Sequence, residues 1–408
     1  MNRKRVAAWV LFDFANSVYP AVITATVFAL YYANTIVGND AGRGDLWWGR
    51  VLAFSMFCVA VSSPVLGSVA DKAGVRKKFL IVYSYLCIVS VVLFTTLEPG
   101  MVLQGFLLAV LANIGFEGSL VYYNAYLAEI APPERQGFVS GLGFGVGYAG
   151  SIVGLLIALP LATRGLFDFT WLTVAGFFAL FSLPSFLGLP SDVKGTLSFS
   201  QAAREGLSGF RRLAADVLSQ KPLRRFLLSF FVYIDGVNTT LYFAGLYTSK
   251  TLGFSFQELI YLFLLIQVSA LVGALVFAKP TDLWGPKRVL NFTLVFWTLI
   301  VIAAYFIEDK TTFFRLAVFS GTGLGVVQAA SRAMMASLIP KGKEAEMFGF
   351  YAFCGKSSSI LGPLLFGFIS HALGGNQRVA LLSIIPFFFV GFILLQRVKA
   401  PRPGQDSA

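Results

Sequence analysis

Long apolar segments alternate with short polar stretches along the whole chain. About 20 apolar residues are enough for a helix to cross a membrane, and twelve segments of this chain reach that length. In the first half we expect helices at 6–37, 46–70, 78–97, one ending near Ile130, 136–160 and one ending near Pro190. In the second half we expect them at 223–249, 255–279, 287–307, 312–339, 345–372 and 378–397. The pattern predicts an all-α membrane protein with twelve transmembrane helices.

The longest interruption of this pattern lies in the middle of the chain. Residues 198–218 place apolar side chains at helical spacing with Arg204, Arg211 and Arg212 between them, as in an amphipathic helix at a membrane surface. We interpret this stretch as a linker, although a recruitment site for a partner is an alternative. The expected divisions are an N-terminal six-helix bundle at 1–190, the linker at 191–222, a C-terminal six-helix bundle at 223–400 and a short tail at 401–408. Two such pseudo-symmetric bundles would surround a central cavity.

Composition and charge support the membrane interpretation. Of the residues, 57% are hydrophobic and 13% are charged, which is more apolar surface than a soluble domain needs. The first apolar segment is too long and too polar for a cleaved signal peptide. The net charge of +12 does not indicate a nucleic-acid partner, because 23 of the 32 basic residues fall on one side of a twelve-helix arrangement. This bias predicts that both termini are cytoplasmic, and it favours anionic membrane lipid as a partner.

A short polar motif occurs twice between apolar segments, with its two acids 211 residues apart. The first copy contains Gly67, Asp71, Gly74 and Arg76, followed by two lysines; the second contains Asp282, Gly285, Lys287 and Arg288. Glycine permits tight turns and close helix approach, and an acid can cap a helix N-terminus. The repeat indicates a protein built from two similar halves. We expect Asp71 and Asp282 to latch one half to the other on the cytoplasmic side.

Two apolar segments carry an acid and an amide at the same spacing. Asp13 and Asn16 lie in the first segment, and Asp235 and Asn238 lie 222 residues later in the seventh. The i, i+3 spacing places both side chains of a pair on one helix face. An ionisable group at this depth is costly unless it faces a polar cavity or a partner. These residues are candidates for substrate binding or ion coupling, and the alternative is that the acids tie helices together.

Other polar residues interrupt three further segments. They are Asn113, Glu117 and Asn124 in the fourth, Gln328 and Arg332 in the tenth, and Lys356 in the eleventh. The carboxylate of a zwitterionic substrate would suit Arg332 and Lys356, and its ammonium group would suit Asp13 and Glu117. A salt bridge from Arg332 to a buried acid would instead indicate a structural role.

Several of these stretches resemble a known superfamily. Gly67-x-x-x-Asp71-x-x-Gly74-x-Arg76 with two lysines is similar to the loop between helices 2 and 3 of major facilitator superfamily transporters. Asp13-Phe-Ala-Asn16-Ser17, Tyr123-Asn124-Ala125 and the segments 328–340 and 344–356 resemble its unknown major facilitator branch, which includes autophagy-related vacuolar amino-acid effluxers. The resemblance implies a transporter of amino acids or similar small polar solutes, with helices 1, 4, 7 and 10 lining its cavity. Helix 4 departs from many proton-coupled members because it carries Glu117 and no arginine.

The leading hypothesis is therefore a monomeric secondary transporter of the bacterial inner membrane that works by alternating access. An enzyme would need catalytic groups, a metal or a cofactor, and the sequence shows no Walker motif and no metal-ligand spacing for its three cysteines. A receptor or lipid scramblase is a third class, which the two-half repeat disfavours. Within transport, an exporter of lipid or hydrophobic drug-like compounds stays open because the chain has 42 phenylalanines. For coupling we favour protons, with Asp13, Glu117 and Asp235 as candidate carriers.

Overall fold

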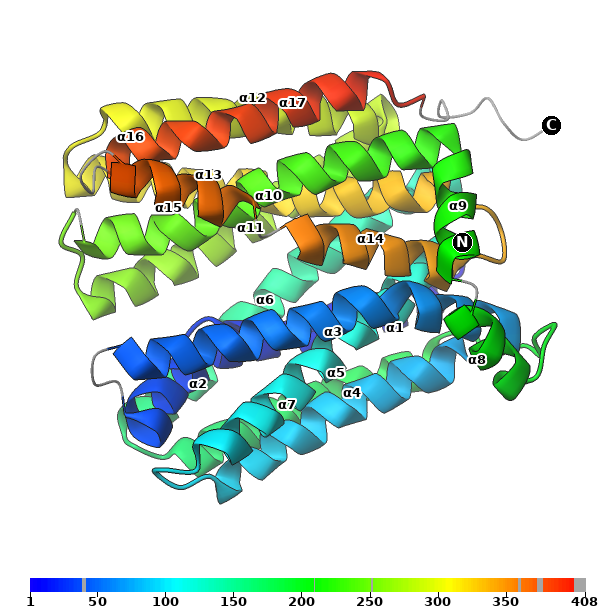
Figure 1. The fold of residues 1–408 in the computed structure, drawn as a ribbon, viewed down its shortest axis with the longest axis horizontal. Helices are drawn as coiled ribbons and strands as arrows, with labels where there is room; N and C mark the ends of the chain where they lie inside the picture. The colour runs from blue at the N-terminus through cyan, green and yellow to red at the C-terminus, as the bar shows by residue number, and fades with distance from the viewer. Residues whose placement is uncertain (39–41, 209, 251, 359–360, 373–376, 400–408) are drawn as a thin grey trace. The chain divides into compact units, whose positions relative to one another are not determined.

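The computed structural model describes residues 1–38, 42–208, 210–250, 252–358, 361–372 and 377–399. Within these ranges the chain is helical and contains no β-strand (Figure 1). The α-helices of the first half are α1 (Arg3–Asn16), α2 (Val27–Tyr31), α3 (Arg43–Ala73), α4 (Arg76–Val92), α5 (Val102–Ile130), α6 (Gln136–Thr163), α7 (Phe167–Gly188), α8 (Phe199–Ser208) and α9 (Phe210–Ser219). Those of the second half are α10 (Lys221–Lys250), α11 (Phe256–Trp284), α12 (Pro286–Phe306), α13 (Lys310–Leu338), α14 (Glu344–Ser358), α15 (Leu361–Ala372), α16 (Gln377–Leu381) and α17 (Ile385–Gln396).

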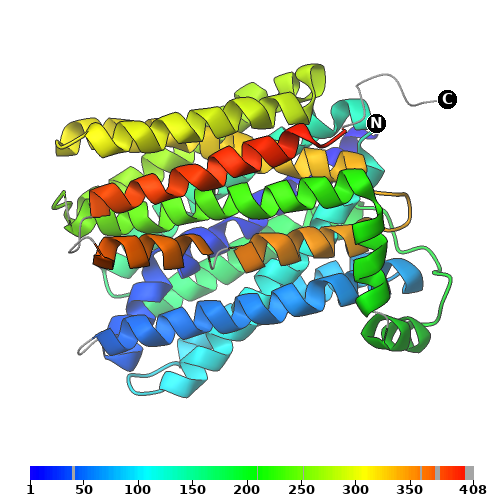
Figure 2. The ribbon, with the colours of Figure 1, turned by 45° about the horizontal axis from the view of Figure 1, so that its top comes forward.

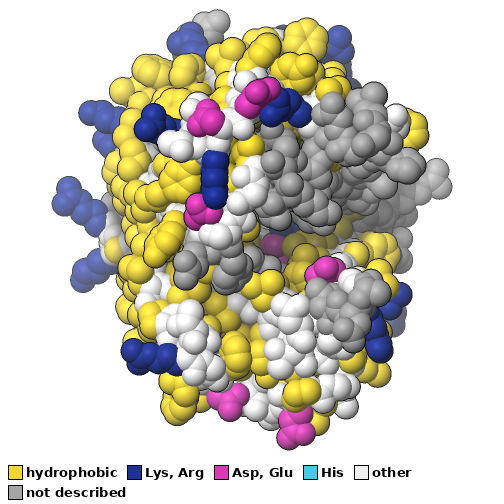
Figure 3. Space-filling model, turned by 90° about the vertical axis from the view of Figure 1, so that its left-hand side faces the viewer, with side chains coloured by type: hydrophobic (Ala, Val, Ile, Leu, Met, Phe, Trp, Pro, Cys, Tyr) yellow, Lys and Arg dark blue, Asp and Glu magenta, His cyan; other side chains and the backbone are white. Residues whose placement is uncertain are grey.

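Ten helical segments of the described chain are long and apolar enough to cross a membrane. Many large apolar side chains on them point outward, among them Phe57, Leu180 and Phe306, as expected where lipid replaces water. Hydrophobic side chains also make up much of the face shown in Figure 3, with charged side chains scattered among them. The expected helix at 223–249 corresponds to α10, and that at 345–372 corresponds to α14 and α15, with residues 359–360 outside the described ranges.

The first segment is not one continuous α-helix, although the sequence predicted one at 6–37. Regular α-helix α1 ends at Asn16, and the π-helical turn η1 (Pro20–Thr24), α2 and a second π-helical turn η2 (Tyr32–Val37) follow. Pro20 explains the change, because it has no N–H to donate and its ring crowds the carbonyl four residues earlier. The polar pair Asp13 and Asn16 therefore lies in the last turn before the irregularity.

The chain forms two compact units, and some of their boundaries fall inside helices. Unit 1 comprises Met1–Ile130, Val146–Phe210 and Pro340–Phe353, and unit 2 comprises Ala131–Gly145, Arg211–Ile339 and Cys354–Ala408. The first part of α6 therefore belongs to unit 2, and the first part of α14 belongs to unit 1. The division into bundles at 1–190 and 223–400 stays a prediction.

Aromatic packing fixes the polar part of α1 within unit 1. Trp9 stacks on Tyr123 of α5 at 4.5 Å between ring centroids, and its indole N–H donates to the Tyr123 carbonyl at 2.9 Å. Phe12 stacks on the same tyrosine at 4.9 Å. Since Asp13 and Asn16 follow on the same helix, these contacts set where their side chains lie. Figures 1 and 2 show α4 beside α5 in this unit.

Small residues and end contacts hold unit 2 together. Gly325 of α13 lies against the backbone of Ala270 in α11, so these two helices approach closely. Figures 1 and 2 show α12 beside α17, where Trp297 stacks on Phe388 at 5.9 Å. At the start of α13 the Asp309 carboxylate accepts the Thr312 backbone N–H at 2.7 Å. This hydrogen bond to the carboxylate lowers the pKa of Asp309, so the cap stays ionised.

Candidate functional site

Asp71 caps a helix that begins 273 residues later in the sequence. Its carboxylate accepts the backbone N–H of Ala345 at 3.2 Å and of Glu346 at 2.9 Å, in the first turn of α14. The first N–H groups of a helix have no partner within the helix and carry partial positive charge. An acid at the end of α3 therefore supplies what the start of α14 lacks. Asp71 and the first turn of α14 both belong to unit 1.

A partly buried ion network surrounds this cap. Arg76, the first residue of α4, lies 2.8 Å from Asp71, 2.8 Å from Glu344 of α14 and 3.2 Å from Glu129 of α5. The Asp71 side chain is 3% exposed and that of Arg76 is 15% exposed. Removing one member of a buried ion pair leaves the other charge uncompensated. We call Asp71, Arg76, Glu129, Glu344 and the first turn of α14 the Asp71 cluster.

Two glycines allow α3 and α14 to approach backbone to backbone. A Cβ atom at Gly67 would overlap the carbonyl group of Ala345, and one at Gly349 would overlap the carbonyl group of Ser63. The predicted role of Gly67 in close helix approach agrees with this geometry. Gly74 ends α3 with φ +65°, a conformation that favours glycine.

Asp282 makes the same kind of contact in unit 2. Its carboxylate accepts the backbone N–H of Gly137 at 2.7 Å and of Phe138 at 3.1 Å, in the first turn of α6. The donors in the two contacts are 208 residues apart, since Gly137 corresponds to Ala345 and Phe138 to Glu346. We call this arrangement the Asp282 contact. The repeat read from the sequence is thus a repeat of backbone geometry as well.

In the part of the chain that the structure describes, the basic residues of the second copy do not pair with the acid of the motif as Arg76 does in the first copy. Lys287 Nζ donates to the carbonyls of Gln396 and Val398, at 2.8 and 2.7 Å, where α17 ends. In the first copy Lys77 Nζ makes the matching bond to the Leu189 carbonyl at 2.9 Å, where α7 ends. At the 211-residue spacing of the two copies, Lys287 stands where the first copy has Arg76, yet its hydrogen bonds are of the kind that Lys77 makes. Arg288 is exposed, and Asp282 forms no ion pair within the described ranges.

Arg332 joins α13 to the start of α6 within unit 2. Its Nε donates to the Ser140 hydroxyl at 3.0 Å, and Nη2 donates to the Ser140 carbonyl at 2.8 Å. The guanidinium group also lies 3.9 Å from the centre of the Phe144 ring. The Ser140 hydroxyl in turn donates to the Ala329 carbonyl at 2.8 Å. These contacts hold the same segment of α6 that Asp282 caps.

The predicted polar residues of the first half lie in unit 1, and Asp13, Asn16, Asn113 and Glu117 are all buried. Asn113 Nδ2 donates to the Ser55 hydroxyl of α3 at 2.6 Å. Asn16 Nδ2 and Asn113 Oδ1 have no hydrogen-bond partner among the described residues. Unsatisfied buried amide atoms are uncommon in proteins, so these two can still bind another polar group.

In the second half, Asp235 caps α15. Its carboxylate accepts the Gly362 backbone N–H at 2.9 Å and the Thr239 hydroxyl at 3.3 Å. An acid of α10 thus accepts a backbone N–H of α15. The other predicted residues, Asn238, Gln328 and Lys356 in unit 2 and Asn124 in unit 1, are half-buried.

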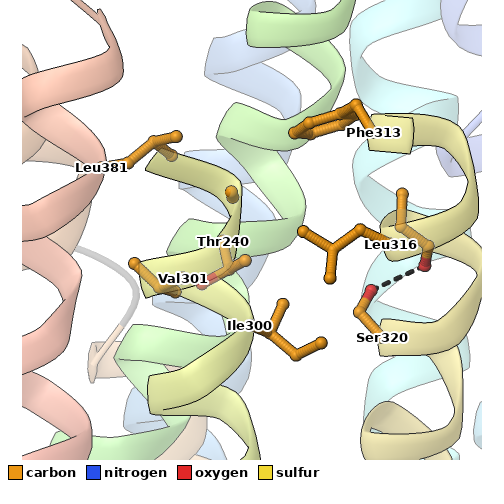
Figure 4. A pocket seen from close by; sticks show the side chains of 9 residues that line it. Thr240, Ile300, Val301, Phe313, Leu316, Ser320 and Leu381 are labelled. Atoms are coloured by element: carbon orange, nitrogen blue, oxygen red, sulfur yellow. Dashed lines mark hydrogen bonds between the residues drawn. The ribbon is translucent and has the colours of Figure 1, made fainter. Parts of the chain in front are cut away.

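Two cavities lie among the described residues, and one of them is lined by the Asp71 cluster. One of about 290 Å³ lies in unit 1 and is lined by Asp71, Gly74, Arg76, Tyr126, Glu129, Asp192 and Glu344 among others. A smaller pocket of about 40 Å³ lies in unit 2 between α10, α12 and α13 (Figure 4). The Ser320 hydroxyl in that pocket already donates to the Ala317 carbonyl and the Thr240 hydroxyl to the Gly236 carbonyl. The small pocket is therefore apolar and offers no group to orient a polar ligand.

Sequence reasoning missed Glu129, Ser140 and Asp192 entirely, and Glu344 entered only within a resembling segment. No spacing signal links these residues to their partners, because Glu129 and Ser140 lie on other helices than their partners and Asp192 lies in the linker after α7. Among the described residues, no group of three His, Cys, Asp or Glu side chains could hold a metal ion.

Comparison with known proteins gives concordant results. The family model described as vacuole effluxer Atg22 like matches residues 51–137 and 131–408. The uncharacterized MFS-type transporter YxiO of Bacillus subtilis is 30% identical over 96% of this chain and 94% of its own length. Autophagy-related protein 22 of Cryptococcus neoformans is 30% identical over 66% of this chain, and the match spans 51% of that protein.

Solved structures show the same fold. The human organic anion transporter MFSD10 aligns with a TM-score of 0.75 at 16% identity, covering 97% of this chain and 100% of that chain. The fucose:proton symporter FucP of E. coli aligns with a TM-score of 0.71 at 14% identity, covering 98% of both chains. At this level of identity the likeness concerns the fold alone.

Proposed function

Because the chain belongs to the family of Atg22-like vacuole effluxers, membrane transporters of the major facilitator superfamily, we propose that it moves a small polar or zwitterionic solute by alternating access. Amino acids are the solutes we favour. The protein is an integral, multi-pass membrane transporter and not an enzyme. We further propose twelve transmembrane helices in two six-helix bundles, at 1–190 and 223–400. Both termini would be cytoplasmic, and the protein would act as a monomer in a bacterial inner membrane.

In this proposal the Asp71 cluster and the Asp282 contact close the cytoplasmic side of the transporter. The observation that carries it is the reciprocal capping. An acid from the first half of the sequence holds α14 of the second half, and an acid from the second half holds α6 of the first half. Opening the cytoplasmic side would break all four N–H···O bonds. The caps therefore favour one state of a two-state equilibrium, which is what alternating access requires.

Buried polar groups support a polar substrate. Asn16 and Asn113 each keep an amide atom without a partner among the described residues, and both lie in the same unit as the buried acids Asp13 and Glu117. These four side chains would suit an ammonium group and its neighbouring polar atoms. Lys356 would face the substrate carboxylate. The bonds from Arg332 to Ser140 favour a role in holding α13 to α6 over direct contact with substrate.

Uptake into proteoliposomes tests the substrate class. Purified protein would be reconstituted and offered a panel of amino acids, sugars and a hydrophobic dye under a pH gradient with the membrane potential clamped. We expect accumulation of one or more amino acids, with competition by other zwitterions. Movement of the dye alone would instead indicate an exporter of hydrophobic compounds.

Proton coupling has its own test. Asp13, Glu117 and Asp235 are the proposed carriers, and Asp235→Asn keeps one side-chain oxygen to accept the Gly362 N–H. We expect this variant to lose uphill accumulation driven by a pH gradient and to keep downhill exchange. Wild-type transport that ignores the pH gradient would exclude proton coupling.

A further inference from the structure

The segment that joins the two halves of the sequence begins with another carboxylate cap. Asp192 Oδ1 accepts the Lys77 backbone N–H at 2.6 Å, and Oδ2 accepts the Lys78 backbone N–H at 3.1 Å. These are the second and third residues of α4. The geometry is that of Asp71 on α14 and of Asp282 on α6, although Asp192 belongs to neither copy of the repeated motif.

Other contacts fasten the same segment around the end of α3. The Leu197 backbone N–H donates to the Lys72 carbonyl at 3.1 Å, and the Tyr126 hydroxyl donates to the Pro190 carbonyl at 3.3 Å. A Cβ atom at Gly74 would overlap the Val193 carbonyl oxygen. Residues 189–197 therefore form a strap across the turn between α3 and α4, and all of them belong to unit 1.

The strap and the Asp71 cluster share one residue and one cavity. Arg76 is the residue directly before the two amides that Asp192 holds, and its guanidinium group bridges Asp71 and Glu344. Asp71, Arg76, Glu344 and Asp192 all line the cavity of about 290 Å³. The orientation of the first turn of α4 thus decides where the Arg76 guanidinium group lies.

We propose that Asp192 is a positioning residue for closure of the cytoplasmic side. By capping α4 it fixes Arg76 across Asp71 and Glu344, so the linker between the halves controls how firmly α14 is held. This inference rests on the proposed closing role of the Asp71 cluster. The inference is based on the capping geometry. Loss of a helix cap costs about 1 kcal/mol, so loss of the Asp192 cap should shift the balance between the closed and the open cytoplasmic side about fivefold.

The test measures exposure of α14 from the cytoplasmic side. A cysteine replaces Ala345, which is fully buried, in a chain whose three native cysteines have been removed. Inverted vesicles are labelled with a membrane-impermeant maleimide. We expect Asp192→Ala to raise the labelling rate about fivefold, Asp192→Asn to raise it less, and Asp192→Glu to restore most of the wild-type value.

Glu205→Gln is the matched control. It also removes one negative charge from the linker, but its bridge to Lys72 is exposed on both sides, and such pairs contribute little. We expect less than a twofold change. An equal effect of Glu205→Gln and Asp192→Ala would overturn the proposal, because the effect would then come from linker charge in general.

Two further variants separate the possible failures. If Asp71→Asn raises labelling but Asp192→Ala does not, the linker inference is wrong and the closing role of Asp71 stands. If Asp71→Asn leaves labelling unchanged, both are wrong. In an Arg76→Ala background, Asp192→Ala should add less than twofold, since coupled residues are not additive. If Asp192→Ala raises labelling as much in the Arg76→Ala background as in the wild-type background, Asp192 stabilises the fold and does not act through Arg76.

Discussion

The Asp71 cluster and the Asp282 contact share a backbone design but differ in charge. In both, a carboxylate at a helix end accepts two consecutive N–H groups of another helix. Among the described residues, Asp71 alone of the two is also paired with an arginine, which Glu129 and Glu344 share. The cap is therefore the common element of the repeat, and within the described ranges the ion network accompanies only the first copy.

The difference extends to the helix that follows each motif. The N-terminus of α4 begins with Arg76 and is capped by Asp192. The N-terminus of α12 begins with Pro286, which has one N–H group fewer to satisfy, and its N-cap residue Gly285 has no side chain that could cap it. The first copy therefore receives a linker residue at the start of its following helix, whereas in the second copy a proline takes the first helical position.

Asp71→Asn should have the largest effect. Asparagine can accept one of the two N–H groups through its single oxygen, and it removes the more deeply buried of the two anions that lie 2.8 Å from Arg76. Loss of one partner of a buried pair costs about 3 kcal/mol or more, so we expect transport to fall more than tenfold. Initial uptake rates in proteoliposomes, normalised to the amount of inserted protein, measure this. Wild-type uptake by the variant would contradict the closing role.

Gly67→Ala and Gly349→Ala should have the next largest effect. The added Cβ atoms meet backbone carbonyl groups that cannot move aside, so α3 and α14 must separate. We expect uptake to fall about tenfold, in line with about 1–3 kcal/mol for overpacking. The control is Gly176→Ala in α7, where no atom lies within 4 Å of the new Cβ. A comparable loss in Gly176→Ala would attribute the effect to general destabilisation.

Asp282→Asn should reduce uptake less than Asp71→Asn does. It removes half of the cap, worth about 1 kcal/mol, but leaves no buried cation unpaired within the described ranges. A reduction of about fivefold is expected. Measuring both variants side by side tests the comparison directly, and equal losses would show that the Arg76 network contributes nothing beyond the cap.

Lys77→Ala and Lys287→Ala should have the smallest effects, and similar ones. Each lysine donates to carbonyls at the end of a helix, at Leu189 and at Gln396 with Val398. Losing such a charged hydrogen bond costs about 1–2 kcal/mol. We expect a lower melting temperature in detergent for both variants and uptake within about threefold of wild type. A collapse of transport in Lys287→Ala alone would mean that Lys287 serves the Asp282 contact after all.

The sequence by itself determined the helical membrane fold, the family and the repeat. Apolar segments of membrane-spanning length leave few alternatives, and the two acids 211 residues apart were singled out by their repeated motif. It also placed the buried acids and amides on their helices. It did not predict the break after Asn16, although Pro20 offered a local signal for it.

Only the tertiary structure decided which groups these residues meet. Lys287 and Arg76 occupy similar places in the two sequence copies, yet one holds the end of α17 and the other holds Asp71. Asp192 looks like an ordinary linker acid until α4 is seen to begin beside it. The physical reason is that a backbone N–H at a helix start has no sequence signature of its own. Its partner is set by where helices distant in the chain come together.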